Sequence, residues 1–210
     1  SDINKARDIY RHPNETLSFF DIKKDMTIVE IYPYGGWYTE IIAPVLAEEG
    51  QYYGAMPDPS SSERRKNSFD KFANKLNDKN LYGNAKAVPI SADSEIALEA
   101  NSVDMVLTFR NLHNMMAYDT AEKMIQDWFK ITKPGGSLGI VEHRGNESIT
   151  QDPKAISGYV NEDYTIKLIE AAGWKFVASS DVNNNPKDDK NYEDRVWRLP
   201  PTLTYFARDE

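Results

Sequence analysis

One stretch of this chain, TIVEIYPYGGWYTEIIAP at residues 27–44, limits the folds open to it most strongly. Residues 27–32 are apolar and mostly β-branched apart from Glu30, which is typical of a strand buried on both faces. A Pro-Tyr-Gly-Gly turn follows, and from Trp37 onward apolar residues recur at helical spacing. A strand, a glycine turn and a helix start in this order are the nucleotide-binding opening of a doubly wound α/β domain.

Strand-like and helix-like segments alternate along the rest of the chain. This alternation predicts one mostly parallel sheet with helices on both faces. At 210 residues we expect a single domain, with residues 1–22 as an N-terminal helical lid and 27–210 as the core. The further predicted strands cover residues 51–56, 85–90, 103–109, 137–142 and 175–180, and 202–207 is a candidate last strand. The predicted helices after the central motif cover residues 61–79, 119–132 and 161–172.

Composition excludes several classes of function. The net charge of −8 provides no basic excess to displace counterions, so no nucleic-acid partner is expected. The chain has no cysteine, which removes disulfides, thiolate metal sites and cysteine nucleophiles. No apolar run approaches the roughly 18 residues of a membrane span, so no membrane insertion is expected. The oligomeric state does not follow from the composition.

Ligands of doubly wound sheets bind beyond the carboxyl ends of the strands, where the strand order reverses. The residues that follow each predicted strand are therefore the candidate site. They are Tyr32 to Trp37, Asp58, Asp93, Arg110 to Asn114, and His143 with Arg144.

Three motifs carry a resemblance to a known family: GGWYTEIIAP at 35–44, VDMVLTFRNLHNM at 103–115 and ITKPGGSLGIVEHRG at 131–145. With them the chain resembles class I S-adenosylmethionine-dependent methyltransferases, and most closely a subgroup of predicted methyltransferases with similar RHP, ETL, FF and LPP segments. The resemblance implies a Rossmann-like three-layer sandwich whose seven-stranded, mostly parallel sheet has an antiparallel last strand. It also implies S-adenosylmethionine as the cofactor and methyl transfer to a small-molecule acceptor.

The resemblance assigns roles to several residues of the candidate site. Glu30 matches the acidic residue at the end of the family's first strand, and Gly36 matches the last glycine of the turn to which Gly35 also belongs. Asp93 matches a residue beside the adenine ring. Met56 stands where the family has the carboxylate that holds the ribose, and Asp58, two residues on, is the candidate substitute.

Two of the three glycine positions of the family's turn carry Tyr32 and Tyr34. Glycine is used there because the backbone must approach the ligand closely, often with positive φ. In one interpretation Tyr32, Tyr34 and Trp37 line the cofactor site, where an aromatic face attracts the sulfonium cation. In the other they fill the former cleft, and the chain is a catalytically degenerate binding or scaffold protein.

Candidate catalytic residues follow the fourth and fifth predicted strands. His113 and His143 are candidate general bases, which are needed if the acceptor is protonated. Arg110, like Arg144, is a candidate contact for an anionic group of the substrate. The alternatives are a packing role for His113, a structural role for His143 and surface salt bridges for the arginines.

Other enzyme classes fit these residues less well. The G-x-G-x-x-G of nicotinamide-dependent oxidoreductases and the G-x-S-x-G of α/β hydrolases are absent. With few histidines near carboxylates, no metal site is predicted. Because relatives that resemble this chain often carry export signals and the sequence begins without methionine, its expected location leans towards periplasmic or secreted, with cytoplasmic as the alternative.

Overall fold

The computed structural model describes residues 2–93, 95–191 and 195–199. The chain divides into two compact units, each built from discontinuous segments. One comprises residues 22–111 and 123–141 and is called the sheet unit below. The other comprises residues 1–21, 112–122 and 142–210 and is called the histidine unit. The predicted single-domain organisation with an N-terminal lid stays a prediction.

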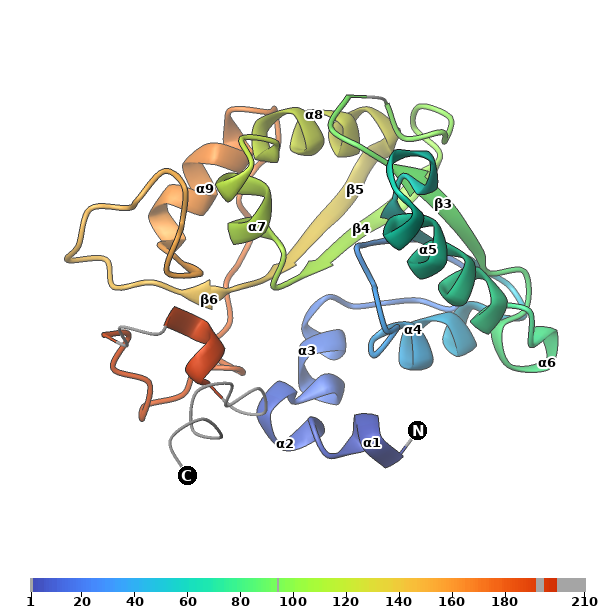
Figure 1. Ribbon diagram of the computed structural model, residues 1–210, viewed down its shortest axis with the longest axis horizontal. Coiled ribbons are helices and arrows are strands. Elements are labelled where there is room, and N and C mark those ends of the chain that lie inside the picture. The colour runs from blue at the N-terminus through green and yellow to red at the C-terminus, as the bar shows by residue number, and fades with distance from the viewer. Residues whose placement is uncertain (1, 94, 192–194, 200–210) are drawn as a thin grey trace. The chain divides into compact units, whose positions relative to one another are not determined.

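A five-stranded parallel sheet forms the centre of the sheet unit, with the strand order β3-β2-β1-β4-β5 (Figure 1). The order reverses between β1 and β4, so this is an α/β Rossmann-like fold. The strands are β1 (Thr27–Ile31), β2 (Gln51–Pro57), β3 (Lys86–Ile90), β4 (Val103–Phe109) and β5 (Thr132–Val141). β1 and β4 are almost wholly buried, which explains their apolar runs.

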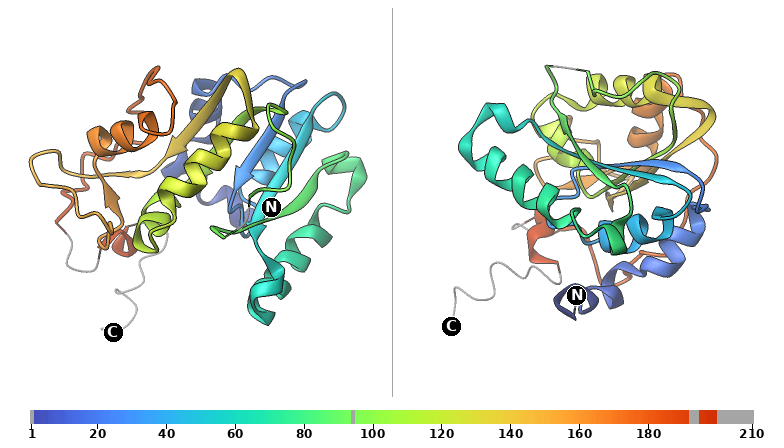
Figure 2. Two further views of the ribbon diagram at one scale, coloured as in Figure 1. Left: turned by 90° about the horizontal axis from the view of Figure 1, so that it is seen from above. Right: turned by 90° about the vertical axis from the view of Figure 1, so that its right-hand side faces the viewer.

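Helices cover both faces of this sheet. α4 (Thr39–Leu46) connects β1 to β2, and α8 (Ala121–Ile131) lies on the opposite face (Figures 1 and 2). α5 (Glu63–Lys75) packs on β2 and β3, while the short η1 (Pro59–Ser61) and α6 (Lys79–Tyr82) flank it. The predicted helices at 61–79 and 119–132 are thus confirmed with shorter bounds.

A close approach between α5 and the sheet explains one glycine. Any side chain at Gly54 in the middle of β2 would overlap the ring of Phe72, which is 2% exposed. The missing Cβ lets the aromatic ring lie directly on the strand. α5 therefore packs close to β2, whose carboxyl end leads to Asp58.

The histidine unit contains mainly short elements. Its N-terminal helices are held to a distant loop, because Asn183 Nδ2 donates to Thr16 Oγ1 at 2.9 Å and Asn183 Oδ1 lies 3.2 Å from His12 Nδ1. The predicted helix at 161–172 is confirmed as α9. The elements are α1 (Asp2–Lys5), α2 (Asp8–Arg11), α3 (Pro13–Phe19), α7 (Leu112–Ala117), β6 (His143–Arg144), β7 (Tyr159–Val160), α9 (Glu162–Glu170) and η2 (Arg195–Arg198).

The resemblance predicted seven strands in one sheet, and this number is wrong for the described part of the chain. There the main sheet has five strands, and β6 and β7 form a separate pair. The predicted sixth strand at 175–180 is not a strand. Phe176 and Val177 are 50% and 91% exposed, and the segment pairs with no described strand, so its apolar residues have no sheet face to cover. The candidate strand at 202–207 lies outside the described residues.

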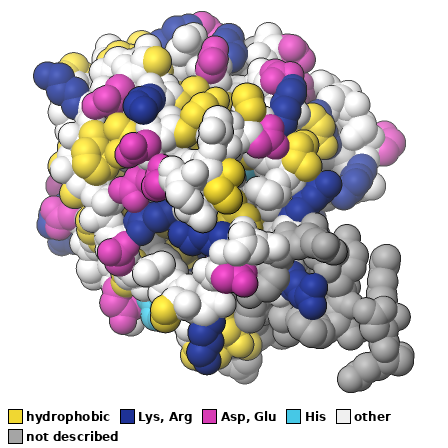
Figure 3. All heavy atoms as spheres, turned by 90° about the vertical axis from the view of Figure 1, so that its left-hand side faces the viewer, with side chains coloured by type: hydrophobic (Ala, Val, Ile, Leu, Met, Phe, Trp, Pro, Cys, Tyr) yellow, Lys and Arg dark blue, Asp and Glu magenta, His cyan; other side chains and the backbone are white. Residues whose placement is uncertain are grey.

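On the face shown in Figure 3, acidic and basic side chains are interspersed over the described residues without a broad basic strip. Within the described ranges, no helix is long and apolar enough to cross a membrane. The predicted absence of a nucleic-acid partner stays a prediction.

Candidate functional site

The turn after β1 has a left-handed backbone at alternate residues. Tyr32, Tyr34 and Gly36 have φ values of 52°, 45° and 74°. The peptide N–H of Tyr32 donates to the carbonyl of Ala55 at 2.8 Å, and that of Gly36 donates to the carbonyl of Pro33 at 2.8 Å. These are the positions at which the resemblance predicts glycines, so the turn has the backbone that a glycine-rich nucleotide turn needs, with tyrosine at two of them.

Positive φ is costly at both tyrosines. A non-glycine residue in this region loses roughly 1–2 kcal/mol through contact of its Cβ with the following carbonyl. Two such residues two positions apart are held against that cost by the surrounding structure. Strained backbone of this kind concentrates at functional sites, which makes the turn the first place to look for a ligand.

Glu30 is buried beneath this turn, at 3% exposure. Its Oε2 accepts hydrogen bonds from Thr39 Oγ1 at 3.0 Å and from Tyr52 Oη at 2.5 Å. Burial raises the pKa of Glu30 to about 7, although the two hydroxyls and the charge of Lys75 counteract it. Because Thr39 is the first residue of α4, the carboxylate ties β1 to the start of that helix. Its contacts are internal, which favours a role in shaping the turn.

Aromatic side chains crowd the same edge. The rings of Tyr32 and Tyr34 stack with centroids 5.8 Å apart and an angle of 26°. Trp37 is buried, and its ring meets Tyr38 edge-on at 4.4 Å. Tyr38 in turn stacks on Phe109, the last residue of β4. Tyr38 was not among the predicted site residues, although its place between Trp37 and α4 was a usable signal.

The two turn glycines differ in their surroundings. A Cβ at Gly35 would meet nothing within 4 Å, whereas one at Gly36 would lie 3.2 Å from Lys75 Nζ. Lys75, the last residue of α5, donates to the carbonyl of Gly35 at 3.0 Å and to Glu40 Oε1 at 2.6 Å. The turn is therefore held by α5 on one side and is open at Gly35 on the other.

Asp58 and Asp93 follow the neighbouring strands β2 and β3, as predicted. Asp58 Oδ1 accepts from the peptide N–H of Ser60 at 2.8 Å and caps η1, and this bond holds the pKa of Asp58 below its usual value. Asp93 is exposed, and its peptide N–H donates to Ser91 Oγ at 3.2 Å. Both carboxylates therefore belong to the edge of the sheet that also carries the turn.

The end of β4 contributes Arg110 and Asn111 to the same edge. Arg110 is half-buried with a φ of 57°, and its peptide N–H donates to the carbonyl of Val141 at 2.7 Å. Asn111 is buried, and its Nδ2 donates to the carbonyls of Ile31 and Phe109, each at 3.2 Å. Asn111 thus joins the ends of β1 and β4. Asn111 belongs to the predicted segment from Arg110 to Asn114, but no role was predicted for it.

A second polar cluster lies in the histidine unit. His113, on α7, is 4% exposed, and its Nδ1 lies 3.0 Å from Glu142 Oε1 while its peptide N–H donates to Oε2 at 3.2 Å. The peptide N–H of His143 also donates to Oε1, at 2.8 Å. Burial raises the pKa of Glu142, but the hydrogen bonds and charge of His113, with those of His143, outweigh it and hold the pKa below its usual value.

This pairing orients the imidazole. An Nδ1 that faces a carboxylate carries the proton, which leaves Nε2 as the basic atom. Nε2 of His113 is buried and has no hydrogen-bond partner in the described part of the chain. The rings of His143 and Trp197 lie 6.0 Å and 5.8 Å from the ring of His113. The pairing of His113 with Glu142 was not predicted from the sequence.

Arg144 makes internal ion pairs. Its Nε lies 2.9 Å from Glu162 Oε2, and its guanidinium also pairs with Asp181. The salt-bridge interpretation is therefore the one that the structure favours for this residue. Among the described residues, no group of three or more histidine, aspartate or glutamate side chains is placed to hold a metal ion.

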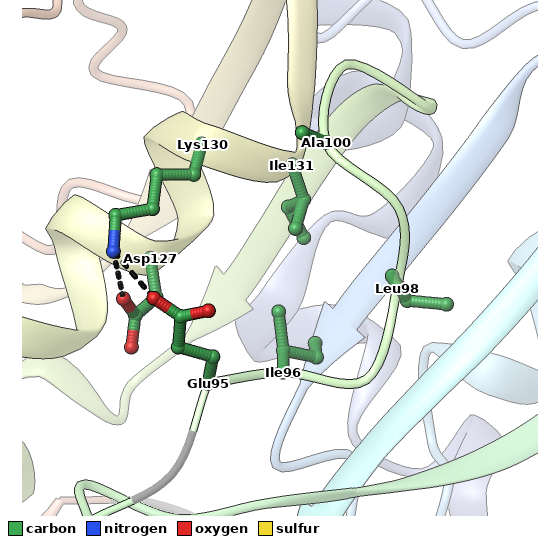
Figure 4. A pocket seen from close by; sticks show the side chains of 7 residues that line it. All are labelled: Glu95, Ile96, Leu98, Ala100, Asp127, Lys130 and Ile131. Carbon is green, nitrogen blue, oxygen red and sulfur yellow. Dashed lines mark hydrogen bonds and ion pairs between the residues drawn. The ribbon is translucent and has the colours of Figure 1, made fainter.

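A small pocket in the sheet unit lies elsewhere, between α8 and the segment that leads into β4 (Figure 4). Lys130 at its rim pairs with Glu95 at 2.7 Å and with Asp127 at 3.3 Å. The peptide N–H of Ser102 donates to the carbonyl of Ile131, which places the pocket near the amino end of β4. Ligands of this fold bind at the opposite edge, so the pocket is not the candidate site.

Known structures share this fold. A S-adenosylmethionine-dependent methyltransferase from Aquifex aeolicus matches with a TM-score of 0.61 and 20% identity, over 80% of this chain and 82% of that one. The [4+2]-cyclase SpnF matches with a TM-score of 0.59 and 14% identity, over 78% and 56% of the two chains. A phosphoethanolamine N-methyltransferase from Haemonchus contortus, solved with S-adenosylhomocysteine, matches with a TM-score of 0.55 and 16% identity, over 78% and 37%.

These neighbours establish the fold, which is the α/β Rossmann-like fold of S-adenosylmethionine-dependent methyltransferases. The chain spans between 37% and 82% of the length of these three neighbours. No protein-family profile and no curated protein sequence matches the chain.

Proposed function

We propose that this protein binds S-adenosylmethionine at the carboxyl edge of the sheet unit and transfers its methyl group to a small-molecule acceptor. The observation that carries the proposal is the turn after β1, where positive φ recurs at Tyr32, Tyr34 and Gly36. This backbone costs energy at the two tyrosines, and a nucleotide turn is the structure that requires it. The fold alone is weaker support, because one neighbour is a cyclase.

The residues at this edge fit such a cofactor. The turn from Tyr32 to Trp37 leads into α4, whose first N–H groups and dipole favour a carboxylate or hydroxyl group. Asp58, which follows β2, is the proposed contact for the ribose. Asp93, which follows β3, is the proposed contact for the adenine. Glu30 is proposed to act indirectly, because its hydrogen bond to Thr39 fixes where α4 begins.

When bound, S-adenosylmethionine supplies an electrophilic methyl group on a sulfonium. A protonated acceptor must also lose a proton, and His113 is the proposed base because Glu142 leaves its Nε2 as the basic atom. His143 is the second proposed base. Arg110 is the proposed partner of an anionic group on the acceptor or the cofactor.

Isothermal titration calorimetry with S-adenosylmethionine tests the proposal. Saturable binding by the wild-type protein and weaker binding by Asp93→Ala are expected, because that variant removes one proposed contact. Asp163→Ala, an exposed carboxylate on α9, is the matched control and should bind as the wild type does. A folded wild-type protein that takes up no S-adenosylmethionine would refute the proposed function.

A binding or scaffold protein of methyltransferase fold is the second candidate. The observation in its favour is that Tyr32, at a glycine position, folds onto α8 and donates its hydroxyl to Met124 Sδ at 3.7 Å. If that side chain fills the cleft, cofactor cannot enter. Tyr32→Gly would then create binding that the wild type lacks, and the same titration would detect it.

A further inference from the structure

The stacked tyrosines of the turn have different environments. Tyr32 is half-buried, with its hydroxyl bonded to Met124 Sδ at 3.7 Å, so its ring is anchored to α8. Tyr34 is 51% exposed and stacks on Tyr32 at 5.8 Å. The anchored ring thus supports the outer ring, and the outer ring keeps half of its surface available.

Core packing does not explain the outer ring. A tyrosine that is half exposed gains little from burial, yet at Tyr34 the chain accepts a φ of 45° that glycine would adopt without cost. The next residue is a glycine, and a Cβ there would stand in open space. Half of this ring stays exposed at the edge of the sheet where ligands of this fold bind, and strained backbone concentrates at such sites, which points to contact with a ligand.

The inner tyrosine, Tyr32, presents a neutral ring. Burial, with the proximity of Tyr34, raises the pKa of Tyr32 to about 12, so its phenol stays protonated at neutral pH. A protonated phenol offers the electron-rich face of its ring and a hydroxyl, and it is not a base. Positive groups are attracted to such faces, more strongly as water is removed.

Nearby positive side chains have partners of their own. Lys75, which holds the turn, pairs with Glu40 at 2.6 Å, and Arg65 on α5 donates to Ser61 Oγ at 2.9 Å. Lys75 is therefore held by a carboxylate, whereas Arg65 is held by a neutral hydroxyl, and its positive charge opposes the rise of the pKa of Tyr32. The stacked rings and the cofactor proposed above then form a complementary pair, because that cofactor carries a sulfonium cation and its product carries a neutral thioether.

We propose that the exposed ring of Tyr34, supported by Tyr32, recognises the positive charge of the sulfonium, so that this site binds S-adenosylmethionine more tightly than S-adenosylhomocysteine. The inference rests on the proposed function, since it concerns the same cofactor. It assigns Tyr34 as a specificity-determining residue that separates cofactor from product by charge.

Calorimetric titration of the full chain with each compound in turn tests this inference. A cation on an aromatic face gives a preference of about two- to thirtyfold for S-adenosylmethionine in the wild type. Tyr34→Phe keeps the aromatic face, and Tyr34→Leu removes it, while both keep a non-glycine residue at positive φ. Circular dichroism of each variant shows whether it is folded.

The expected result is a preference that Tyr34→Phe retains and Tyr34→Leu reduces to about one. Equal binding of the two compounds by the wild type would overturn the charge recognition while leaving the proposed cofactor intact. A preference that survives in Tyr34→Leu would also overturn it, because the charge would then be read by another group. Binding of neither compound would instead refute the proposed function and this inference with it.

Discussion

Replacing Glu30 with glutamine should remove a pH dependence of stability near neutral pH. The carboxyl group is buried and accepts hydrogen bonds from Tyr52 and Thr39, and burial raises its pKa from the ordinary 4.5 to about 7. Between these two pH values the folded protein binds the proton more tightly than the unfolded chain does. Stability therefore falls as the pH rises through this window, and above it the full cost of the buried charge remains.

The magnitude follows from the two pKa values. One pKa unit is worth about 1.4 kcal/mol, so the change from 4.5 to about 7 corresponds to about 3 kcal/mol. Glutamine keeps an oxygen acceptor for the two hydroxyls but does not titrate. Relative to Glu30→Gln, the wild type should lose about 3 kcal/mol of unfolding free energy between pH 4.5 and pH 8.

Urea unfolding followed by tryptophan fluorescence, at pH 5, 6, 7 and 8, measures this difference. The exposed carboxylate of Glu48 provides the control, and Glu48→Gln should follow the wild-type pH dependence. If the difference in unfolding free energy between the wild type and Glu30→Gln is the same at every pH, the conclusion that burial raises the pKa of Glu30 is refuted.

Three further predictions concern single residues and use the same urea assay. Tyr34→Gly should be more stable than Tyr34→Ala by about 1 kcal/mol, since both remove the ring and only glycine relieves the φ of 45°; equal stabilities would argue against strain. Gly54→Ala should cost about 1–3 kcal/mol through overlap with Phe72, and a neutral result would contradict the close packing of α5. Glu142→Gln should cost about 1–3 kcal/mol at neutral pH because His113 loses a charged acceptor. That loss should shrink as the pH falls through the lowered pKa of Glu142, and a constant loss would contradict the pairing.

Much of the sheet unit could be predicted from the sequence. All five of its strands overlap predicted ones, because most of them are apolar runs, and the glycine turn marks where β1 ends. The prediction failed at 175–180, because the local pattern of Phe176 and Val177 resembles a strand but only a neighbouring strand can make it one. β6 and β7 have two residues each, too few to show a period.

Which residues lie at the carboxyl edge of the sheet was predictable, but their detailed contacts were not. Residues after the strands could be chosen because parallel strands end at one edge. The positive φ of Tyr32 and Tyr34 could not be predicted in this way, because tyrosine itself disfavours positive φ and only the surrounding structure holds it there. The pairing of His113 with Glu142 joins residues 29 positions apart, and no local pattern reveals such a contact.

A nuclear magnetic resonance titration tests the central claim most directly. Uniformly ¹⁵N-labelled protein is titrated with S-adenosylhomocysteine, and the amide signals are followed in ¹H–¹⁵N correlation spectra. The account predicts shifts centred on residues 32–40, with further shifts near Asp58 and Asp93. Shifts centred on other residues, or none at saturating ligand, would contradict the claim that the strained turn after β1 is a cofactor site.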